Sequence, residues 1–347
     1  MKIIVDVMGG DNAPEETVKG VIMASRELDA EYIVVGNRED IERIAKEEDF
    51  DLRGVEIVHA DDVVTMEDDP LSITRAKKNS SMAVGLRLLA EGRGDAFVST
   101  GNTGALFTGA TLIVRKIRGL QRAGIGTVLP MKNPVLLLDC GANVTVTDEN
   151  LEQFGVVGTA YMRKMFGIAS PRVGLLNNGT EACKGTELQQ AAYRRLKDSP
   201  DVNFVGNVEG SAIPFDSCDV LVTDGFTGNI LLKSIEGVGK FMLGKLKSVL
   251  YSSLITKLAA AVIKKPLYSM KKDLDPSEQG GSPILGISKP VIKAHGSSNA
   301  KAFKNAIRQA IDFAGSGAIE EIGEVVGTYA ARKKAERESL KNQESAE

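Results

Sequence analysis

The chain has 347 residues, enough for one large α/β unit or two subdivided ones. Its hydrophobic content of 43% and charged content of 26% are ordinary for a globular enzyme. A net charge of −3 argues against generalised nucleic-acid binding, which requires a broad basic excess.

The cysteines and the N-terminus indicate a cytoplasmic setting. Cys140, Cys183 and Cys218 lie far apart and match no zinc spacing, so we expect neither a disulfide framework nor a metal site. The first apolar run is too short for a signal peptide and is broken by Asp6. No stretch approaches the ~20 apolar residues of a spanning helix. We expect a soluble protein that at most lies on a membrane surface.

One pattern recurs along the chain: a short β-branched run, a polar loop of small residues, and a helical period. The first strand is expected at residues 2–8, followed by Gly9 to Asn12 and a helix that opens at Pro14. Further strands are expected at 32–35, 55–58, 95–99, 135–139, 172–176, 220–223 and 290–294. The alternation predicts right-handed βαβ units in an α/β/α layered, Rossmann-like fold with a mostly parallel sheet.

Six of these strands are followed by the same kind of Gly/Asn/Ser/Thr loop. The loops are residues 9–12, 100–104, 140–143, 177–180, 224–229 and 295–299. Turns favour such residues on their own. Ligands of open α/β sheets nevertheless bind beyond the carboxyl ends of the strands. We therefore expect the loops to form one shared ligand site.

Glycine-rich turns that open helices are typical anion sites, because unsatisfied N–H groups and the helix dipole favour phosphate. Residues 101–104 and 225–229 have this form, but GxxxxGK[ST], GxGxxG and GxSxG are all absent. Lys184 follows the 177–180 loop at a helix start, where it either meets an anion or faces solvent. His295 is either a site residue or a loop residue, whereas His59 is interpreted as structural or surface-exposed. Cys140 is interpreted as a small buried thiol.

Residues 237–272 differ in composition from the rest of the chain. They contain eight lysines and, up to Lys272, no Asp or Glu, with apolar residues at spacings of three and four. This pattern predicts a protruding basic amphipathic helical hairpin. It would serve either dimerisation, with a solvated lysine face, or contact with a membrane surface. We thus expect an α/β domain over 1–330 with this insertion at 237–272, and a charged tail over 331–347 that is a frayed helix or disordered.

Several segments together carry a family likeness. They are IIVDVMGGDNAPEETVKG, VSTGNTGALFTGA, LLDCGANV, GLLNNGTEACKGTE, VTDGFTGNILLKSIEG and KAHGSSNAKAFKNAI. In this order they resemble the acyl-ACP:phosphate acyltransferase family of bacterial phospholipid synthesis (the PlsX family), over roughly residues 1 to 325. That family is similar in fold to isocitrate/isopropylmalate dehydrogenases and phosphate acetyltransferases, while using no nicotinamide.

The resemblance implies a reaction between an acyl thioester on acyl carrier protein and inorganic phosphate. The products are acyl phosphate, which a glycerol-phosphate acyltransferase uses next, and the free carrier; no cofactor is implied. Phosphate is already anionic at neutral pH, so positioning and charge neutralisation suffice and a catalytic triad is not needed.

The resemblance also implies roles for residues. Lys184 and Asn229 match the catalytic pair, in which Lys184 binds phosphate and its transition-state charge and Asn229 orients phosphate or the thioester oxygen. The expected secondary contacts are Asn102, Thr103, Gly104, Asn143, Asn178, Gly228 and His295. Homodimerisation and peripheral membrane attachment fall on the basic segment, with Leu254, Leu258, Ala261 and Val262 as contacts. The basic residues that either face the acidic carrier or form a solvated surface are Arg75, Lys77, Lys78, Arg115, Lys116, Arg118 and Arg122.

Two other hypotheses remain at this point. An NAD(P)-dependent decarboxylating dehydrogenase of the related fold is one, against which stand the missing GxGxxG and the lack of an evident metal-carboxylate cluster. The other is a non-catalytic membrane scaffold that organises lipid-synthesis enzymes through residues 240–272.

Overall fold

The computed structural model describes residues 1–265 and 280–344, and this part of the chain forms one sheet of eleven strands. In spatial order the strands are β3 (Val55–His59), β2 (Glu31–Gly36), β1 (Lys2–Asp6), β4 (Ala96–Ser99), β11 (Val291–Ala294), β10 (Gly281–Leu285), β5 (Gly124–Pro130), β6 (Pro134–Leu138), β9 (Val220–Val222), β7 (Arg172–Asn177) and β8 (Asn203–Glu209). Every strand expected from the sequence is present, with ends that agree within two residues. The mostly parallel α/β sheet is confirmed.

The sheet consists of two parallel blocks that run in opposite directions. Strands β3, β2, β1, β4 and β11 are parallel to one another, and so are β6, β9, β7 and β8. Between the blocks, β11 pairs antiparallel with β10, β10 with β5, and β5 with β6. Three reversals in succession leave the second block pointing opposite to the first.

The expected set of strands lacked three members, β5, β8 and β10, and two of these are the strands that join the blocks. β10 contains Pro283, and a proline within a run argues against a central strand. β5 has glycines at its first and third positions, Gly124 and Gly126, and ends at a proline. β8 pairs with β7 across a register shift. Their weak strand signals explain why the reversal of direction was not predicted.

Helices cover both faces of the sheet, as alternate strand residues show. Ile3 and Val5 belong to one buried cluster, together with residues of α1, α5, α11 and α12, whereas Ile4 belongs to the other, with residues of α3 and α4. Successive strand side chains point to opposite faces, so the two clusters are the two faces of the sheet. The helices are α1 (Glu15–Glu27), α2 (Arg38–Glu47), α3 (Ser81–Ala90), α4 (Thr103–Gly109), α5 (Asp148–Phe166), α6 (Glu187–Asp198), α7 (Gly225–Leu250), α8 (Leu254–Val262), α11 (Ala300–Gly315) and α12 (Ala318–Glu344). This three-layer arrangement agrees with the expected α/β/α architecture.

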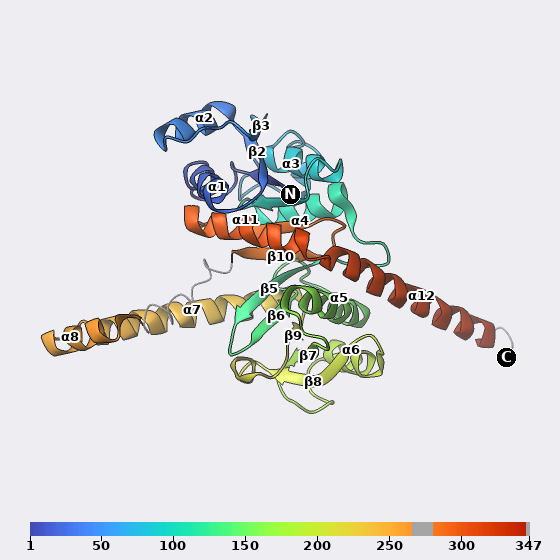
Figure 1. Cartoon of the computed structure of the whole chain (residues 1–347). Coiled ribbons are helices and arrows are strands. Elements are labelled where there is room, and N and C mark those ends of the chain that lie inside the picture. Colours follow the sequence, from blue (N-terminus) through green and yellow to red (C-terminus); the bar gives the residue numbers. More distant parts are fainter. Residues whose placement is uncertain (266–279, 345–347) are drawn as a thin grey trace.

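Two helical segments project from the body in opposite directions (Figure 1). α7 leaves the middle of the molecule and α8 follows it end to end, while α12 projects on the other side. The domain boundary expected at 237 lies inside α7, which begins at Gly225, and the boundary expected at 331 lies inside α12. The described part of the arm, 225–265, does not fold back on itself. Any returning half of the predicted hairpin, with Lys271 and Lys272, falls on residues 266–279, outside the described residues.

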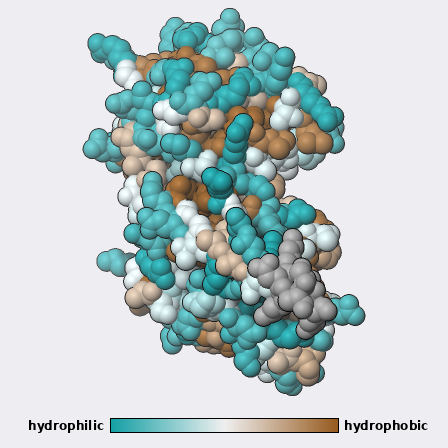
Figure 2. Space-filling view, turned by 90° about the vertical axis from the view of Figure 1, so that its right-hand side faces the viewer, coloured by the Kyte–Doolittle hydropathy of each residue, from teal (hydrophilic) through white to brown (hydrophobic). Residues whose placement is uncertain are grey.

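Seen from the side toward which α12 projects, the surface is mainly hydrophilic (Figure 2). Hydrophobic patches interrupt it in the upper half and near the middle, where the body narrows between its two halves. Among the helices of the described residues, none combines the length and the apolar character that a membrane span requires.

Candidate functional site

A cleft of about 400 Å³ lies where the two blocks of the sheet meet. Its lining combines the antiparallel strands β5 and β10 with loops from both blocks and the first turns of α7. The lining residues are Thr103, Ile125, Thr127, Cys140, Gly141, Asn229, Leu232, Lys233, Glu236, Gly280, Gly281, Ser282, Lys293, Ala294, His295 and Gly296.

The strand registers explain how loops from opposed blocks reach one cleft. The end of β11 pairs with the start of β10, Ala294 with Gly281, and the end of β10 pairs with the start of β5, Leu285 with Gly124. The start of β5 in turn lies beside the end of β6, where Gly126 pairs with Leu138. The carboxyl ends of β11 and β6 are therefore separated mainly by the length of β10. The cleft extends from one of these ends to the other.

The expectation of six loops around one ligand at one sheet edge was too broad. Four loops contribute to the cleft lining, through Thr103, through Cys140 and Gly141, through Asn229, and through His295 and Gly296. The 9–12 loop instead supports two of these: Thr100 donates from Oγ1 to the Gly9 carbonyl, and the Asp11 N–H donates to the Gly296 carbonyl at 2.9 Å. The 177–180 loop does not line the cleft.

The amides of the 140–143 loop are occupied by a buried carboxylate. Asp139 is fully buried and accepts from the N–H groups of Ile125, Gly141, Ala142 and Asn143 at 2.7–3.1 Å. The side-chain amide of Asn143 donates to the same carboxylate at 2.8 Å and to the Ala123 carbonyl at 2.7 Å. Asp139 thus fills the anion nest that this loop would otherwise offer, and Asn143 shapes the loop rather than lining the cleft.

Gly228 allows helix α7 to approach this carboxylate loop. A Cβ built on Gly228 would lie 2.0 Å from the Asp139 carbonyl oxygen, so only glycine permits this approach. Asp224 caps the helix by accepting from the Thr227 N–H at 2.8 Å. With its first turn held in this way, α7 places the half-buried Asn229 in the cleft beside Gly141.

Lys293 lies in the lining between the two blocks and is the charged residue within the otherwise apolar strand β11. Its ammonium donates to the carbonyl oxygens of Thr100, at 3.2 Å, and of Ala294. Burial lowers the pKa of Lys293 to about 8, and the negative charges of Asp11 and Asp6 oppose this shift. At neutral pH the side chain is a cation inside the cleft.

Two further groups near Lys293 have shifted pKa values. Burial raises the pKa of Asp6, although that carboxylate accepts from Ser99 Oγ at 2.7 Å and from the Met8 N–H at 3.1 Å. Partial burial lowers the pKa of His295, whose Nδ1 lies 2.9 Å from Ser297 Oγ; the Glu236 charge opposes this shift and Lys293 adds to it. Neutral His295 and charged Lys293 therefore coexist near pH 7.

Asn102 is a helix cap. Its Oδ1 accepts from the Ala105 N–H at 3.0 Å, and its amide donates to the carbonyls of Thr65 and Met66 at 3.0 and 3.2 Å. Both ends of the buried side chain are thus used within the protein. Thr103 is exposed at the cleft, whereas Gly104 allows the close packing of Pro70, whose Cγ would lie 2.8 Å from an added Cβ.

The structure separates Lys184 and Asn178 from the cleft lining. Both are exposed, in a loop held by its own bonds, such as that from the Asn177 amide to the Lys184 carbonyl at 3.2 Å. Among the described residues no ion pair involves Lys184. The predicted pairing of Lys184 with Asn229 is not a contact in this conformation and stays a prediction.

The thiol in the cleft is not poised for attack. Cys140 lies 3.0 Å from Thr127 Oγ1 and donates to the Ile125 carbonyl at 3.1 Å. Burial raises its pKa to about 12, so the thiol is protonated at neutral pH. This agrees with its interpretation as a buried thiol.

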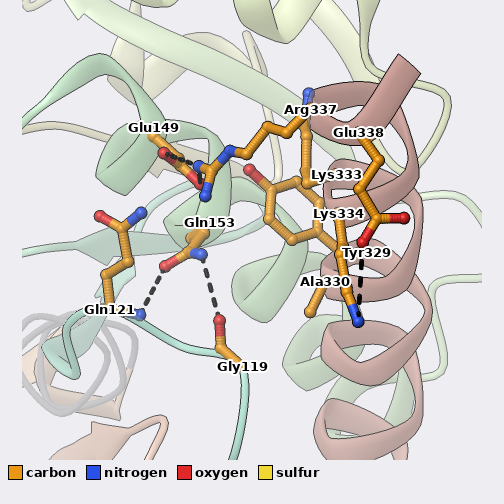
Figure 3. A pocket seen from close by; sticks show the side chains of 10 residues that line it. All are labelled: Gly119, Gln121, Glu149, Gln153, Tyr329, Ala330, Lys333, Lys334, Arg337 and Glu338. Atoms are coloured by element: carbon orange, nitrogen blue, oxygen red, sulfur yellow. Dashed lines mark hydrogen bonds and ion pairs between the residues drawn. The ribbon is translucent and has the colours of Figure 1, made fainter. Parts of the chain in front are cut away.

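A second cavity, of about 360 Å³, lies between α5, α12 and the turn at Gly119 (Figure 3). Its cations have partners: Arg337 pairs with Glu149 at 2.9 Å, Lys333 with Glu152 at 3.4 Å and Lys334 with Glu338 at 3.8 Å. In the cleft, by contrast, Lys293 forms no ion pair with any described residue. The cleft is therefore the candidate site for an anionic ligand.

Of the residues predicted from the sequence, Thr103, Asn229 and His295 line the cleft, together with Lys293 and Glu236, which were not predicted. Lys293 had a usable signal, because a lysine inside the run Val291–Ala294 is rare in a buried strand. Glu236 had none, because its place depends on where α7 meets the other block. In the described part of the chain, no group of three His, Cys, Asp or Glu residues is arranged to hold a metal ion.

Comparison with known proteins gives consistent results. The model of the family described as fatty acid synthesis protein matches residues 1–321. A phosphate acyltransferase of Acetivibrio thermocellus is 45% identical over 324 residues, covering 93% of this chain and 95% of the relative. Many further curated relatives carry the same name, including one from Clostridioides difficile at 41% identity.

Solved structures share the architecture. A phosphotransacetylase from Streptococcus pyogenes matches with a TM-score of 0.62 at 19% identity, covering 92% of this chain and 94% of that chain. A 4-hydroxythreonine-4-phosphate dehydrogenase from Klebsiella pneumoniae matches with a TM-score of 0.56 at 13% identity, covering 90% and 99%. At these identities the likeness shows the fold alone, which agrees with the expected similarity in fold to phosphate acetyltransferases.

Proposed function

The chain belongs to the fatty acid synthesis protein family, whose curated members are phosphate acyltransferases, and from this premise we propose how its cleft performs acyl transfer to phosphate. The protein is an acyltransferase of lipid synthesis, so the dehydrogenase and the purely structural scaffold are not favoured. The acyl donor in our proposal is a thioester of acyl carrier protein. The acyl phosphate produced is then consumed by a glycerol-phosphate acyltransferase.

The observation that supports direct attack by phosphate is the composition of the cleft. It offers a cation, Lys293, and an amide, Asn229, but the thiol within it, Cys140, is protonated. In the proposed step a phosphate oxygen forms a bond to the thioester carbonyl carbon, the C–S bond breaks, and the electron pair leaves with the carrier's sulfur, which takes up the proton that hydrogen phosphate releases. Phosphate supplies its own negative charge, so no general base is required.

We assign the stabilisation of the developing charge to Lys184 and Asn229. Asn229 is placed in the cleft by the α7 first turn and orients phosphate or the thioester oxygen. Lys184 reaches the reacting atoms once its exposed loop contacts the bound substrates. Thr103 and His295 contribute contacts from the opposite block.

Thiol release from acyl carrier protein, followed with and without phosphate, tests the activity. Release that does not depend on phosphate would contradict the proposal. Lys184→Ala should lower the rate by about 100-fold or more, as the loss of a charge-stabilising donor does. A near-normal rate would remove Lys184 from the mechanism.

Two surfaces complete the proposal. Arg75, Lys78, Arg115, Arg118 and Arg122 are exposed and suit an acidic carrier protein, whereas Lys77 is paired with Asp62 at 2.7 Å and is less available. The arm of α7 and α8 exposes apolar side chains, with Leu258 72% and Val262 84% accessible, and Ala261 is exposed beside them. Leu254 begins α8, and its side chain lies outside the described residues.

The arm provides the contacts for a homodimer and for peripheral attachment to the cytoplasmic membrane in this proposal. Its lysines would face anionic head groups while the apolar side chains enter the interface.

A further inference from the structure

We propose that Lys293 binds the inorganic phosphate substrate in the cleft, as a fixed cation that acts in addition to Lys184. This inference rests on the proposed function, since it concerns which residue holds the acceptor of the acyl group. It assigns ground-state binding of phosphate to a strand residue in the floor of the cleft, whereas Lys184 belongs to an exposed loop.

The geometry around Lys293 leaves capacity for a ligand. An ammonium group has three N–H donors, and two of them are used by the carbonyls of Thr100 and Ala294. The side chain lines the cavity and has no ion pair with a described carboxylate. A partly buried cation without a paired anion is costly, and an anionic ligand in the cleft relieves that cost.

The position of Lys293 is fixed by its surroundings. The two carbonyls belong to the loop after β4 and to β11 itself, and β11 pairs with β4 on one side and β10 on the other. The ammonium therefore needs little reorganisation when phosphate binds. Lys233, which also lines the cleft, is exposed on α7 and has no such anchoring bonds to the part of the chain that the structure describes.

The charges around the cleft favour a cation there at neutral pH. Asp6 and Asp11 raise the pKa of Lys293 against the effect of burial, which keeps it near 8. The Asp6 carboxylate is already engaged by Ser99 Oγ and the Met8 N–H, and so competes less for the ammonium. A phosphate group carries more than one negative charge at neutral pH. A single lysine does not neutralise this charge, so Lys293 acts in addition to Lys184.

Kinetics of Lys293→Met test the proposal, with Lys46→Met as the matched control because Lys46 is exposed on α2. Methionine keeps the length of the side chain and removes the charge. We expect the KM for phosphate to rise about tenfold or more in K293M, which corresponds to the loss of one charge-assisted hydrogen bond. The KM for the acylated carrier should change less than about twofold, and K46M should resemble the wild type.

Phosphate groups also occur in the prosthetic arm of a carrier protein, and the two KM values distinguish the two sources. An increase confined to the KM for the acylated carrier would overturn the proposal, and so would an unchanged KM for phosphate. If K293M does not fold, the wild-type protein provides the second test.

That test is lysine acylation of the wild type at pH 8, located by mass spectrometry. A lysine with a pKa near 8 reacts faster than ordinary lysines, because more of it is unprotonated. Inorganic phosphate should protect Lys293, while chloride of equal ionic strength should not, and Lys46 should react equally in both. Equal labelling of Lys293 with and without phosphate would contradict the inference. Because binding is measured without turnover, its failure is distinguishable from a lack of acyl transfer.

Discussion

Two charged side chains in the cleft region, the buried Asp139 and the partly buried Lys293, have different roles, and single substitutions separate them. Asp139 is an anion surrounded by N–H donors of its own chain, whereas Lys293 is a cation without an ion-pair partner among the described residues. We expect Asp139 to stabilise the fold and Lys293 to bind the ligand.

Asp139→Asn should lower the free energy of unfolding by about 2–4 kcal/mol. An amide presents an NH₂ group to N–H donors that the carboxylate accepted, so at least two buried donors lose their partner. Urea unfolding followed by circular dichroism measures the effect. The matched control is Asp29→Asn at an exposed position, for which we expect a change within about 0.5 kcal/mol. Equal stability of the two variants would mean that the Asp139 network contributes nothing.

The pH dependence of phosphate use should follow Lys293. Its ammonium is present below a pKa of about 8 and is lost as the pH rises through that value, so kcat/KM for phosphate should fall above pH 8 to 9 and level off about tenfold or more below its neutral value, near that of K293M. His295 does not produce this decline, because its pKa is lowered from an ordinary value of 6.5. The carboxylates whose charges act on Lys293 are Asp11 and Asp6, and burial raises the pKa of Asp6, while Glu236 acts on His295.

Lys293→Arg provides the control for this profile, because a guanidinium does not titrate below pH 12. We expect the arginine variant to lose the alkaline decline, whatever its absolute rate. A decline that persists unchanged in the variant would assign the ionisation to another group.

Residue types and spacing predicted which loops contribute to the cleft better than which of their side chains are available to a ligand. Asn102, Thr103, Asn143 and Asn229 all belong to polar loops of the expected kind. Only Thr103 and Asn229 line the cleft, because the amides of Asn102 and Asn143 are consumed by backbone carbonyls and by Asp139. Which partner an asparagine finds depends on segments distant in sequence, such as Thr65 for Asn102, and a local pattern does not contain that information.

At the scale of elements, the contact between α7 and the Asp139 loop determines where Asn229 lies. Gly228→Ala should lower the melting temperature and the activity together, because the new Cβ would overlap the Asp139 carbonyl oxygen and must displace the helix. We expect a loss of stability of about 1–3 kcal/mol, as overpacked sites show, measured by thermal unfolding together with the transfer rate.

Gly237→Ala is the matched control on the same helix. Outside its own helix, no atom of the described residues lies within 4 Å of a Cβ built at Gly237, and alanine is favoured over glycine in a helix by about 0.5–1 kcal/mol. This variant should be as stable as the wild type or more so, with an unchanged rate. If both alanines behave alike, the close approach at Gly228 has no structural importance.

The same scale shows why the cleft itself was not predicted. Strong hydrophobic runs such as 135–138 and 220–222 identified the parallel strands, whereas Gly124 and Pro283 obscured β5 and β10. These two strands reverse the sheet direction and form the floor of the cleft. Without them, the loops appear to share one edge of a uniformly parallel sheet.

For the whole molecule, the two-block body accounts for acyl transfer, but it does not explain the arm. Beyond its first three turns, where Gly225 and Gly228 are buried and Leu231, Leu232 and Ile235 are partly buried against the core, α7 exposes apolar residues that continue along the arm to Val262. Exposure of these apolar side chains to water does not stabilise a monomer, so we expect the arm to lie against lipid or a second copy of the chain.

Leu258→Glu distinguishes the two surroundings of the arm from a merely solvated one. Leu258 is 72% accessible, and a carboxylate there would place a charge in the membrane interface or the dimer contact. We expect the variant to lose most flotation with anionic liposomes, or to dissociate in sedimentation velocity if the arm mediates dimerisation. Transfer from a soluble acyl carrier protein should change little, because the substitution lies far along the arm from the cleft.

The matched control is Ser248→Glu, which adds the same charge at an exposed polar position of α7, so a purely electrostatic effect would weaken both variants equally. If both float and sediment as the wild type does, neither lipid nor a second subunit covers the apolar side of α8.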